Sequence, residues 1–264
     1  MHKTPVEVME HLVCCVPVSP MRADESHKSE MVSQQLFGEK SILLERGANN
    51  WLKIQLKYDG YEGWVQQSHV AEIDEEMYLK SDRNLTSDWI NEVDYNGHNM
   101  FVPFGCSLSA FKNGIAFWRK NTANYNGNFW NPEEIQITPK IIKQIAFKFL
   151  NTSYLWGGKS VFGIDCSGYA QMCYKFLNVS LKRDASEQAT QGTIVNFLQE
   201  ARCGDLAFFD NEEGKIIHVG ILLNDHEIIH AAGKVRIDKI DTEGILNLET
   251  KQRTHHLRII KRFL

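Results

Sequence analysis

The chain has 264 residues, of which 43% are hydrophobic and 23% charged, and its formal net charge is -4. This length and composition predict a folded protein with ample core, built as one large domain or as two to three small ones. The slightly acidic balance gives no electrostatic basis for binding nucleic acid or an anionic membrane surface. No run of about 18 apolar residues occurs, so the sequence predicts no membrane span.

The start of the chain and the cysteines bear on the cellular compartment. Residues 1–18 contain acids and a proline and lack the apolar segment of a signal peptide. The six cysteines show no paired spacing typical of zinc sites, and reduced thiols are expected. Cys14, Cys15 and Cys106 lie in apolar runs and are expected to be small core residues. These features favour a cytoplasmic location, whereas an export signal already removed would place the chain in the periplasm.

The first half of the chain is typical of short strands separated by turns. Strand patterns occur at LVCCVPV, QLFGEKSILLER, WLKIQL and GYEGWVQ, with Tyr58-Asp59-Gly60 as a hairpin signal. A second set follows at MYLKSD, NMFVPFG and GIAFWR. Many short strands with frequent turns favour small barrels over a βαβ fold. We therefore predict two all-β modules, at residues 1–75 and 76–133.

The pattern changes at Pro139. Apolar residues then recur at helical spacing, with Thr138 as the expected N-cap. A glycine-rich loop, a second helix over about 166–177 and a run of strands from Gly204 follow. Helices followed by antiparallel strands indicate an α+β domain, which we place at residues 134–264.

The segment WGGKSVFGIDCSG delivers a cysteine to the start of the second helix. Helix N–H groups and the positive end of the helix dipole would lie beside the Cys166 thiol, lower its pKa and supply oxyanion donors. Cys166, Ala170 and Cys173 share one face of this helix, so the thiol should point toward the protein. The alternative is a small buried residue in an ordinary turn.

A candidate base lies in the apolar strand KIIHVGILL. A lone histidine in such a strand is more often a buried core residue, but Gly220 removes bulk from the face that carries His218. A turn at Asn224-Asp225 would fold this strand back onto EIIHAAG and place His218 opposite His230. The second imidazole could hold the first in its working tautomer. A register slip of one residue would put His230 on the wrong face.

The stretches WGGKSVFGIDCSG, HVGILL and IIHAAG, in this order, resemble the NlpC-type cysteine peptidases, which have a papain-like fold and cleave bacterial cell-wall peptides. The resemblance spans roughly residues 134–264. It implies Cys166 as nucleophile, His218 as general base and His230 as the third polar residue, without a metal or organic cofactor. The front half resembles bacterial Src-homology-3-like modules. The implied fold class is therefore multi-domain: two small all-β Src-homology-3-like barrels followed by an α+β papain-like catalytic domain.

This layout is similar to that of γ-D-glutamyl-L-diamino-acid endopeptidases of the dipeptidyl-peptidase VI type. The resemblance implies hydrolysis of the γ-D-glutamyl–L-diamino-acid bond in murein peptides with a free N-terminal L-Ala, in cell-wall peptide recycling or remodelling. A thiolate of Cys166 paired with protonated His218 would attack, and the Tyr154 hydroxyl is a candidate oxyanion donor. Two alternatives are a non-catalytic peptidoglycan-binding protein and a papain-like amidase or acyltransferase. Whether the diamino acid is diaminopimelate or lysine cannot be read from the sequence.

A free ammonium group on the substrate needs carboxylate or carbonyl partners in the cleft. A substrate whose amine is blocked must be excluded by steric clash with the cleft wall. The resemblance implies that the substrate cleft is lined by Tyr154, Trp156, Asp165, Ser167 and Asp184 of the last domain and by Glu30, Tyr61 and Trp64 of the first module. Ala185 stands where the family has a second small polar residue, with Ser186 one position further on. Asp184 could instead cap a helix, and Trp64 could be barrel core. His255 and His256 are expected to be exposed residues beside the terminal strand, without a metal role.

Overall fold

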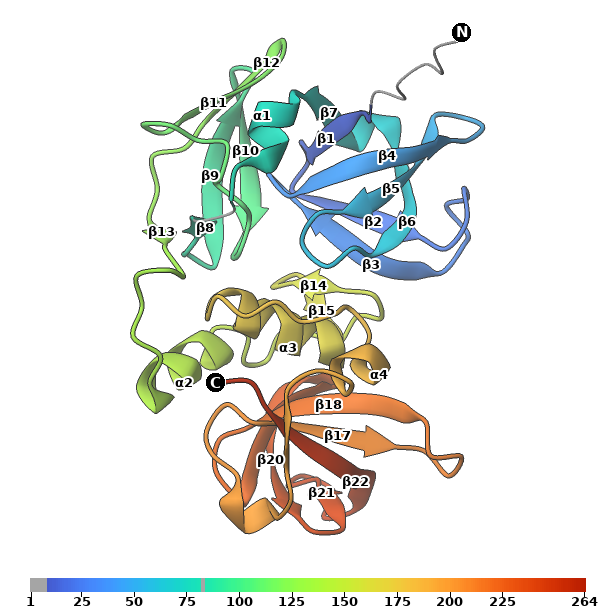
Figure 1. Ribbon diagram of the computed structural model, residues 1–264, viewed down its shortest axis with the longest axis vertical. Helices are drawn as coiled ribbons and strands as arrows, with labels where there is room; N and C mark the ends of the chain where they lie inside the picture. Colours follow the sequence, from blue (N-terminus) through green and yellow to red (C-terminus); the bar gives the residue numbers. More distant parts are fainter. Residues whose placement is uncertain (1–8, 82–83) are drawn as a thin grey trace, which may run out of the picture.

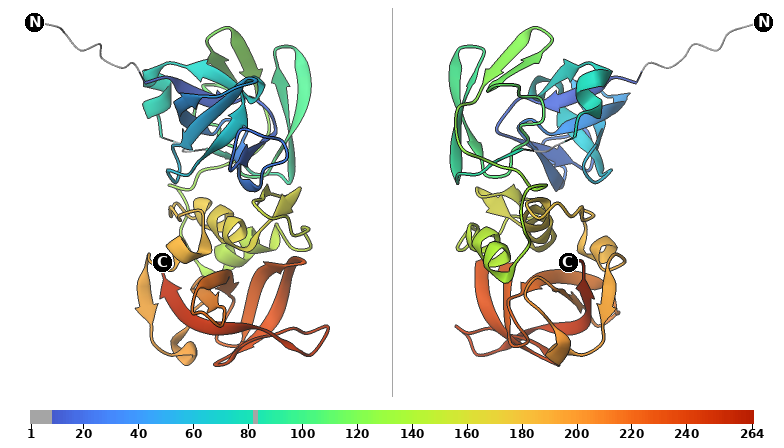
Figure 2. Two further views of the ribbon diagram at one scale, coloured as in Figure 1. Left: turned by 90° about the vertical axis from the view of Figure 1, so that its right-hand side faces the viewer. Right: turned by 60° about the vertical axis from the view of Figure 1, so that its left-hand side comes forward.

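The computed structural model describes residues 9–81 and 84–264. Residues 1–8, where the first predicted module begins, and 82–83, which include the last residue of MYLKSD, lie outside this description. Figures 1 and 2 show two β-rich parts side by side at one end of the molecule. A layer of short helices separates them from a third β-rich part, which the last strands of the chain form. No helix in the described ranges is long and apolar enough to cross a bilayer.

The first β-rich part is one antiparallel sheet. Its strands occur in the order β3-β2-β6-β5-β4-β1-β7. The hairpin predicted at residues 58–60 joins β5 to β6, and Gly60 has a φ of 76°, which a glycine adopts without strain. The elements are β1 (His11–Cys14), β2 (Val18–Arg22), β3 (Met31–Leu36), β4 (Lys40–Arg46), β5 (Trp51–Leu56), β6 (Glu62–Gln66), the 3₁₀ turn η1 (Gln67–His69) and β7 (Val70–Ile73).

The second β-rich part follows a short helix. The strand predicted at MYLKSD is wrong, because residues of this stretch belong to α1 (Glu75–Leu79). The Asp74 carboxylate accepts a hydrogen bond from the Met77 N–H at 2.7 Å and so caps this helix. The strands pair in the orders β10-β9-β12-β11 and β13-β8. They are β8 (Leu85–Thr86), β9 (Ile90–Tyr95), β10 (His98–Pro103), β11 (Ile115–Trp118), β12 (Asn121–Asn124) and β13 (Phe129–Trp130).

The C-terminal part combines helices with a sheet that closes on itself. Thr138 caps the first helix as predicted, accepting from the Ile141 N–H. The sheet order is β16-β22-β17-β18-β19-β20-β21, and an additional β21–β22 pairing completes a ring. The elements are α2 (Pro139–Phe147), β14 (Lys159–Ser160), β15 (Gly163–Ile164), α3 (Cys166–Lys175), α4 (Ala185–Gln188), β16 (Thr193–Val195), η2 (Leu198–Glu200), β17 (Leu206–Asp210), β18 (Ile216–Leu222), β19 (Glu227–Ala232), β20 (Lys234–Asp241), β21 (Gly244–Leu246) and β22 (Arg253–Arg262).

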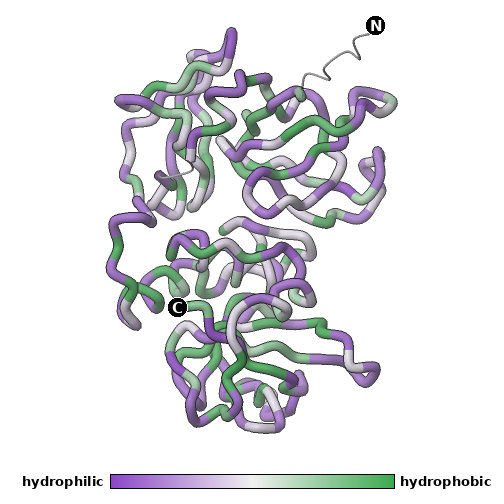
Figure 3. Tube along the Cα trace, in the orientation of Figure 1, coloured by the Kyte–Doolittle hydropathy of each residue, from purple (hydrophilic) through white to green (hydrophobic). Residues whose placement is uncertain are grey.

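Helix α3 is the centre of the molecule. Every residue from Cys166 to Lys175 is buried, because β18 and β19 pack on one side of the helix and the β-rich parts lie on the other. Apolar segments run along the strands beneath it, whereas the hairpin tips are polar (Figure 3). Burial on all sides fixes the helix axis, and therefore fixes where its N-terminus emerges.

A buried ion cluster joins the last turn of α3 to both β-rich parts. The Lys175 ammonium donates to Glu39 at 2.7 Å and to the carbonyl of Gly105 at 2.9 Å. Lys159 lies 3.8 Å from the same Glu39 carboxylate. Burial raises the pKa of Glu39, but the two lysines outweigh it and leave this pKa lowered. One carboxylate therefore compensates two buried cations at the junction.

We expect Glu39→Gln to destabilise the protein by about 3–5 kcal/mol, because it leaves two buried ammonium groups without a counter-charge. Urea unfolding would measure the change. The matched control is Glu76→Gln, which removes an exposed pair with Lys80 and should cost less than about 0.5 kcal/mol. Equal effects of the two substitutions would contradict a stabilising role of the buried cluster.

Candidate active site

The glycines before Cys166 allow two close backbone approaches. Gly157 has a φ of 75°, and a Cβ there would lie 2.2 Å from the carbonyl oxygen of Met31 in the first β-rich part. A Cβ on Gly158 would lie 2.4 Å from the carbonyl oxygen of Gly163. The loop can therefore pack against β3 and against its own return path only because these positions have no side chain.

Asp165 fixes the start of α3. Its Oδ1 accepts from the Gly168 N–H at 2.6 Å, which makes it the helix N-cap, and its Oδ2 accepts from the Gly157 N–H at 2.9 Å. Arg183 donates to both carboxylate oxygens. Both side chains are buried. Asp165 borders the cleft as the resemblance implied, but its oxygens already have donors, so its contacts indicate a positioning role and not ammonium binding.

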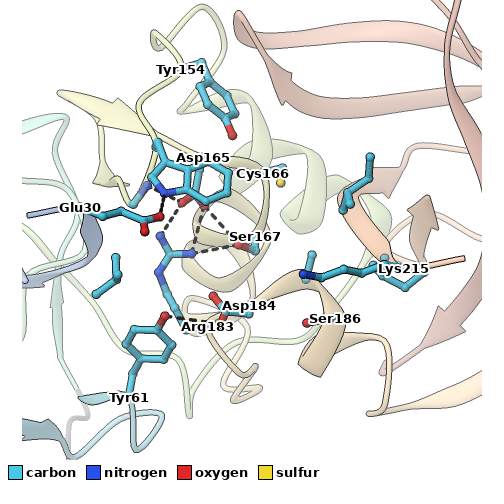
Figure 4. A pocket seen from close by; sticks show the side chains of 16 residues that line it. Glu30, Tyr61, Tyr154, Asp165, Cys166, Ser167, Arg183, Asp184, Ser186 and Lys215 are labelled. Atoms are coloured by element: carbon cyan, nitrogen blue, oxygen red, sulfur yellow. Dashed lines mark hydrogen bonds and ion pairs between the residues drawn. The ribbon is translucent and has the colours of Figure 1, made fainter. Parts of the chain in front are cut away.

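The Cys166 sulfur faces the cleft from the first turn of α3 (Figure 4). Backbone hydrogen bonds from Val219, the residue after His218, and from Ser167 reach the thiol. These bonds lower its pKa, but burial and the charge of Asp165 outweigh them and raise the pKa to about 12. The prediction that the helix terminus gives a low thiol pKa is therefore wrong for the resting site.

The two predicted histidines meet as expected, although their register differs. The structure pairs His230 with Gly220 and not with His218, a shift of two residues. An even shift keeps both imidazoles on one face of the sheet. His218 Nε2 lies 2.8 Å from His230 Nδ1. A Cβ on Gly220 would lie 2.8 Å from the His230 Cβ, so the glycine provides the room that this contact needs.

The electrostatic surroundings of His218 disfavour its charged form. Burial lowers its pKa well below the ordinary value, and His230 and His255 lower it further. His255 stacks on the His218 ring with a centroid separation of 4.0 Å. The expectation that His255 is merely an exposed residue is therefore wrong, because residues on β22 fold over the predicted base. His256 is exposed as expected.

The cleft beside Cys166 is a cavity of about 550 Å³ between the first β-rich part and the C-terminal part. Its wall includes most of the predicted cleft residues, whereas Trp64 lies outside it, beside Gly47. The two histidines are buried. The lining residues are Glu30, Val32, Tyr61, Tyr154, Trp156, Gly157, Asp165, Cys166, Ser167, Arg183, Asp184, Ala185, Ser186, Lys215, Ile216 and Ile217.

Carboxylates gather at the end of the cleft that the first β-rich part closes. Glu30 accepts a hydrogen bond from the Trp156 indole at 2.6 Å, across the two parts. The Tyr61 hydroxyl donates to Asp184 at 3.4 Å. Asp184 precedes α4 but makes no side-chain cap. Burial raises its pKa, and Arg183 opposes this effect. The end of the cleft can therefore receive a positively charged group.

Lys215 is a cleft residue that the sequence analysis did not identify. Its side chain extends into the cavity toward Ser186 (Figure 4). Within residues 9–81 and 84–264, no acidic side chain lies within ion-pair distance of its ammonium. It follows the turn before β18 and precedes His218 by three residues. The cleft wall thus contains a lysine ammonium as well as the carboxylates of Glu30 and Asp184.

Comparison with known proteins agrees with this arrangement. The NlpC/P60 family model matches residues 151–254, and the bacterial dipeptidyl-peptidase SH3 domain model matches residues 21–70. The gamma-D-glutamyl-L-lysine dipeptidyl-peptidase of Bacillus subtilis is 45% identical over 215 residues, which cover 75% of this chain and 71% of that protein. The chain belongs to the NlpC/P60 family. It is a cysteine peptidase in which an SH3 domain precedes the NlpC/P60 catalytic domain.

More distant relatives align with a larger share of the chain. The gamma-D-glutamyl-L-lysine dipeptidyl-peptidase of Bacillus cereus is 25% identical over 261 residues, which cover 84% of this chain and 74% of that protein. A crystal structure of an NlpC/P60 family protein from Bacillus cereus superimposes with a TM-score of 0.78 at 18% identity, covering 96% of this chain and 99% of the other. The fold of this NlpC/P60 peptidase is therefore shared over nearly its full length.

Proposed function

We propose that this NlpC/P60 peptidase hydrolyses the γ-D-glutamyl–L-diamino-acid bond of murein peptides that have a free N-terminal L-Ala. The observation that carries the proposal is the acidic, closed end of the cleft next to Cys166. Glu30 and Tyr61 of the first β-rich part form this end together with Asp184. A closed end limits how many residues can precede the scissile bond, and its acids suit an ammonium group.

The contacts at the closed end support recognition of a free amine. The Asp184 carboxylate is half-buried and receives the Tyr61 hydroxyl. Glu30 is held by the Trp156 indole. Charge-assisted hydrogen bonds from an ammonium to such carboxylates are stronger than neutral ones. A peptide whose alanine is still acylated has no ammonium there and brings bulk against the wall.

Lys215 supports a γ-linked glutamate. A γ-glutamyl bond leaves the α-carboxylate of the glutamate free, at the other end of the glutamyl carbon chain from the scissile carbonyl. The Lys215 side chain enters the cleft from the side opposite Glu30, and its ammonium points toward Ser186 (Figure 4). A neutral α-linked residue would present no carboxylate there, whereas an α-linked glutamate would present its side-chain carboxylate at the same number of bonds from the scissile carbonyl. The names of the Bacillus relatives, gamma-D-glutamyl-L-lysine dipeptidyl-peptidase, describe cleavage at such a linkage.

The mechanism follows from the burial of both reacting groups. The Cys166 thiol, which receives a backbone hydrogen bond from Val219 next to His218, has a raised pKa, and the His218 imidazole has a lowered one, so the two groups rest uncharged. His218 accepts the thiol proton as the sulfur attacks the γ-carbonyl carbon. The resulting oxyanion accepts from the backbone N–H of Cys166 and from the Tyr154 hydroxyl. Burial and the neighbouring Cys166 raise the pKa of Tyr154, so this hydroxyl keeps its proton.

Collapse of the tetrahedral intermediate breaks the amide bond. The protonated His218 gives its proton to the leaving α-amine of the diamino acid. His218 then removes a proton from water, which attacks the thioester and releases L-Ala-γ-D-Glu and the thiol. His230 orients His218 through the 2.8 Å contact and does not itself touch the reacting atoms.

The architecture and location belong to the same proposal. We propose that residues 76–133 are a second Src-homology-3-like module between a first at 1–75 and a papain-like catalytic domain at 134–264. The sheet of β9 to β12 and the packing of α3 against a β-sheet support these assignments. A cleft that demands a free amine suits peptides already released from the wall, which supports a role in recycling in the cytoplasm.

We expect Cys166→Ala to abolish release of L-Ala-γ-D-Glu from L-Ala-γ-D-Glu-L-Lys and its diaminopimelate counterpart, as measured by product mass. His218→Ala should reduce kcat by on the order of 10³-fold because it removes the base, and His230→Ala by less. Turnover at the wild-type rate by the Cys166 variant would refute the assignment. Binding without any product would favour a non-catalytic protein, and a transferred or amide-derived product would favour the acyltransferase or amidase alternative.

We expect the acid limb of kcat, at saturating substrate, to lie below pH 6.5. His218 must be neutral to accept the thiol proton, and a lowered pKa keeps it neutral as the pH falls through 6.5. Rates between pH 5 and 7.5 would locate this limb. Asp184→Asn is the control, because the raised pKa of that carboxyl places a second titration on the acid side. A limb at or above pH 6.5 in both proteins would contradict the neutral pair.

We expect Lys215→Gln to lower kcat/KM by about tenfold, since one charge-assisted contact to the substrate carboxylate is lost. The wild type should lose a similar factor on a substrate whose glutamyl α-carboxylate is an amide, whereas the variant should not distinguish the two substrates. Lys182→Gln, outside the cleft wall, is the matched control. If the loss of kcat/KM from the Lys215 substitution and the loss from the amide substrate were additive, a direct contact between Lys215 and the substrate carboxylate would be excluded.

A further inference from the structure

Asp238 on β20 lies behind His230 and has no place in the catalytic residues assigned above. Its side chain is 1% exposed. His230 Nε2 lies 3.0 Å from its Oδ2. A carboxylate only accepts hydrogen bonds, so this contact requires a proton on His230 Nε2. The contact therefore specifies which nitrogen of the second imidazole is protonated.

Arg236 balances the charge of this carboxylate. Its Nε donates to Oδ2 at 2.8 Å and its Nη2 to Oδ1 at 3.1 Å. The Leu248 N–H also donates to Oδ1, at 2.8 Å. Burial would raise the pKa of Asp238, but hydrogen bonds from His230, Leu248 and Arg236 outweigh it and lower the pKa to about 2. Asp238 is therefore charged at every working pH, and its counter-charge is already supplied.

The proton positions then follow along the chain of contacts. A His230 ring that is protonated at Nε2 alone has a bare Nδ1. This Nδ1 accepts from His218 Nε2 across 2.8 Å. A neutral His218 protonated at Nε2 has its own Nδ1 free as an acceptor. A base that takes a proton from the thiol needs this free nitrogen.

We propose that Asp238, held by Arg236, is a positioning residue that sets the tautomers of His230 and His218 and so keeps Nδ1 of His218 available to Cys166. The inference rests on the proposed roles of these three residues. His255 is the other titratable side chain against the two rings, with centroids 4.0 Å from His218 and 5.9 Å from His230. Burial lowers the pKa of His255 to about 4, so it adds no charge near neutral pH.

The test compares Asp238→Asn with Asp238→Ala. Oδ1 faces two donors that cannot change, the Leu248 N–H and Arg236 Nη2, whereas Oδ2 faces one such donor, Arg236 Nε, and the tautomeric His230. The asparagine oxygen should therefore take the Oδ1 position, so that its NH₂ faces His230. This group donates to His230 Nε2, moves the ring proton to Nδ1 and leaves His218 protonated at Nδ1, the nitrogen that is proposed to accept the thiol proton. The alanine variant imposes no tautomer, because it removes the side-chain acceptor without adding a donor.

We expect Asp238→Asn to lower kcat by on the order of 10²–10³-fold with KM changed by less than about twofold. Asp238→Ala should lose only about tenfold. A purely structural role predicts the reverse order, because the isosteric variant disturbs packing less. Asp241→Asn, on the same strand but in an exposed pair with Arg253, is the matched control and should stay within about twofold. An alanine variant as impaired as the asparagine variant would overturn the proposal.

Two measurements test the role of Asp238 independently of the peptide that the enzyme cleaves. The rate of Cys166 alkylation by iodoacetamide reports thiol activation without any peptide, and it should fall in the same order as kcat. Ring ¹⁵N chemical shifts of the wild-type protein should show both histidines protonated at Nε2. A wild-type His218 protonated at Nδ1 would overturn the tautomer assignment, even if Asp238→Asn does not fold. Normal alkylation and tautomers without peptide cleavage would instead contradict the proposed function.

Discussion

The buried pair of Asp165 and Arg183 is the interaction on which the site depends. The carboxylate caps α3 through Gly168, and the guanidinium donates to Ser33 of the first β-rich part at 3.1 Å. The pair thus connects the start of the catalytic helix to the module that closes the cleft. Loss of either partner would leave an uncompensated buried charge at the point where the thiol is positioned. Fold and catalysis therefore share one constraint.

The same constraint explains why the cleft needs both parts of the chain. The C-terminal part provides Cys166 and its histidines, whereas Glu30 and Tyr61 come from the SH3 domain. An isolated catalytic domain would have a groove open at this end. The buried cluster of Glu39 with Lys175 holds the two parts together at the opposite end of α3. The proposed specificity for a free amine would thus be a property of the interface between the parts.

The sequence predicted features that depend on local periodicity, and missed those that depend on long-range contact. Strand period placed His218 and His230 on one face even though the register is shifted by two. The shift arises in the loop, where Leu223 pairs with Glu227 and the Asn224 side chain accepts from the His226 N–H. The helix at Met77 begins at the Asp74 cap, which the strand pattern of MYLKSD does not include. Asp238 and His255 lie in no recognisable sequence motif, because it is the closing of the sheet that brings β20 and β22 to the two histidines.

Burial determines which protonation states are favourable in the proposed catalytic centre. It disfavours charge on Cys166 and His218 alike, which favours a neutral pair over a standing thiolate–imidazolium pair. The two imidazoles form a chain in which the proton position on one ring determines which nitrogen of the other ring is protonated. Such a chain has two equivalent directions unless one end is fixed. In the proposed arrangement, the ion pair of Asp238 with Arg236 fixes the end away from the cleft, so the direction of proton transfer is set from behind the two histidines.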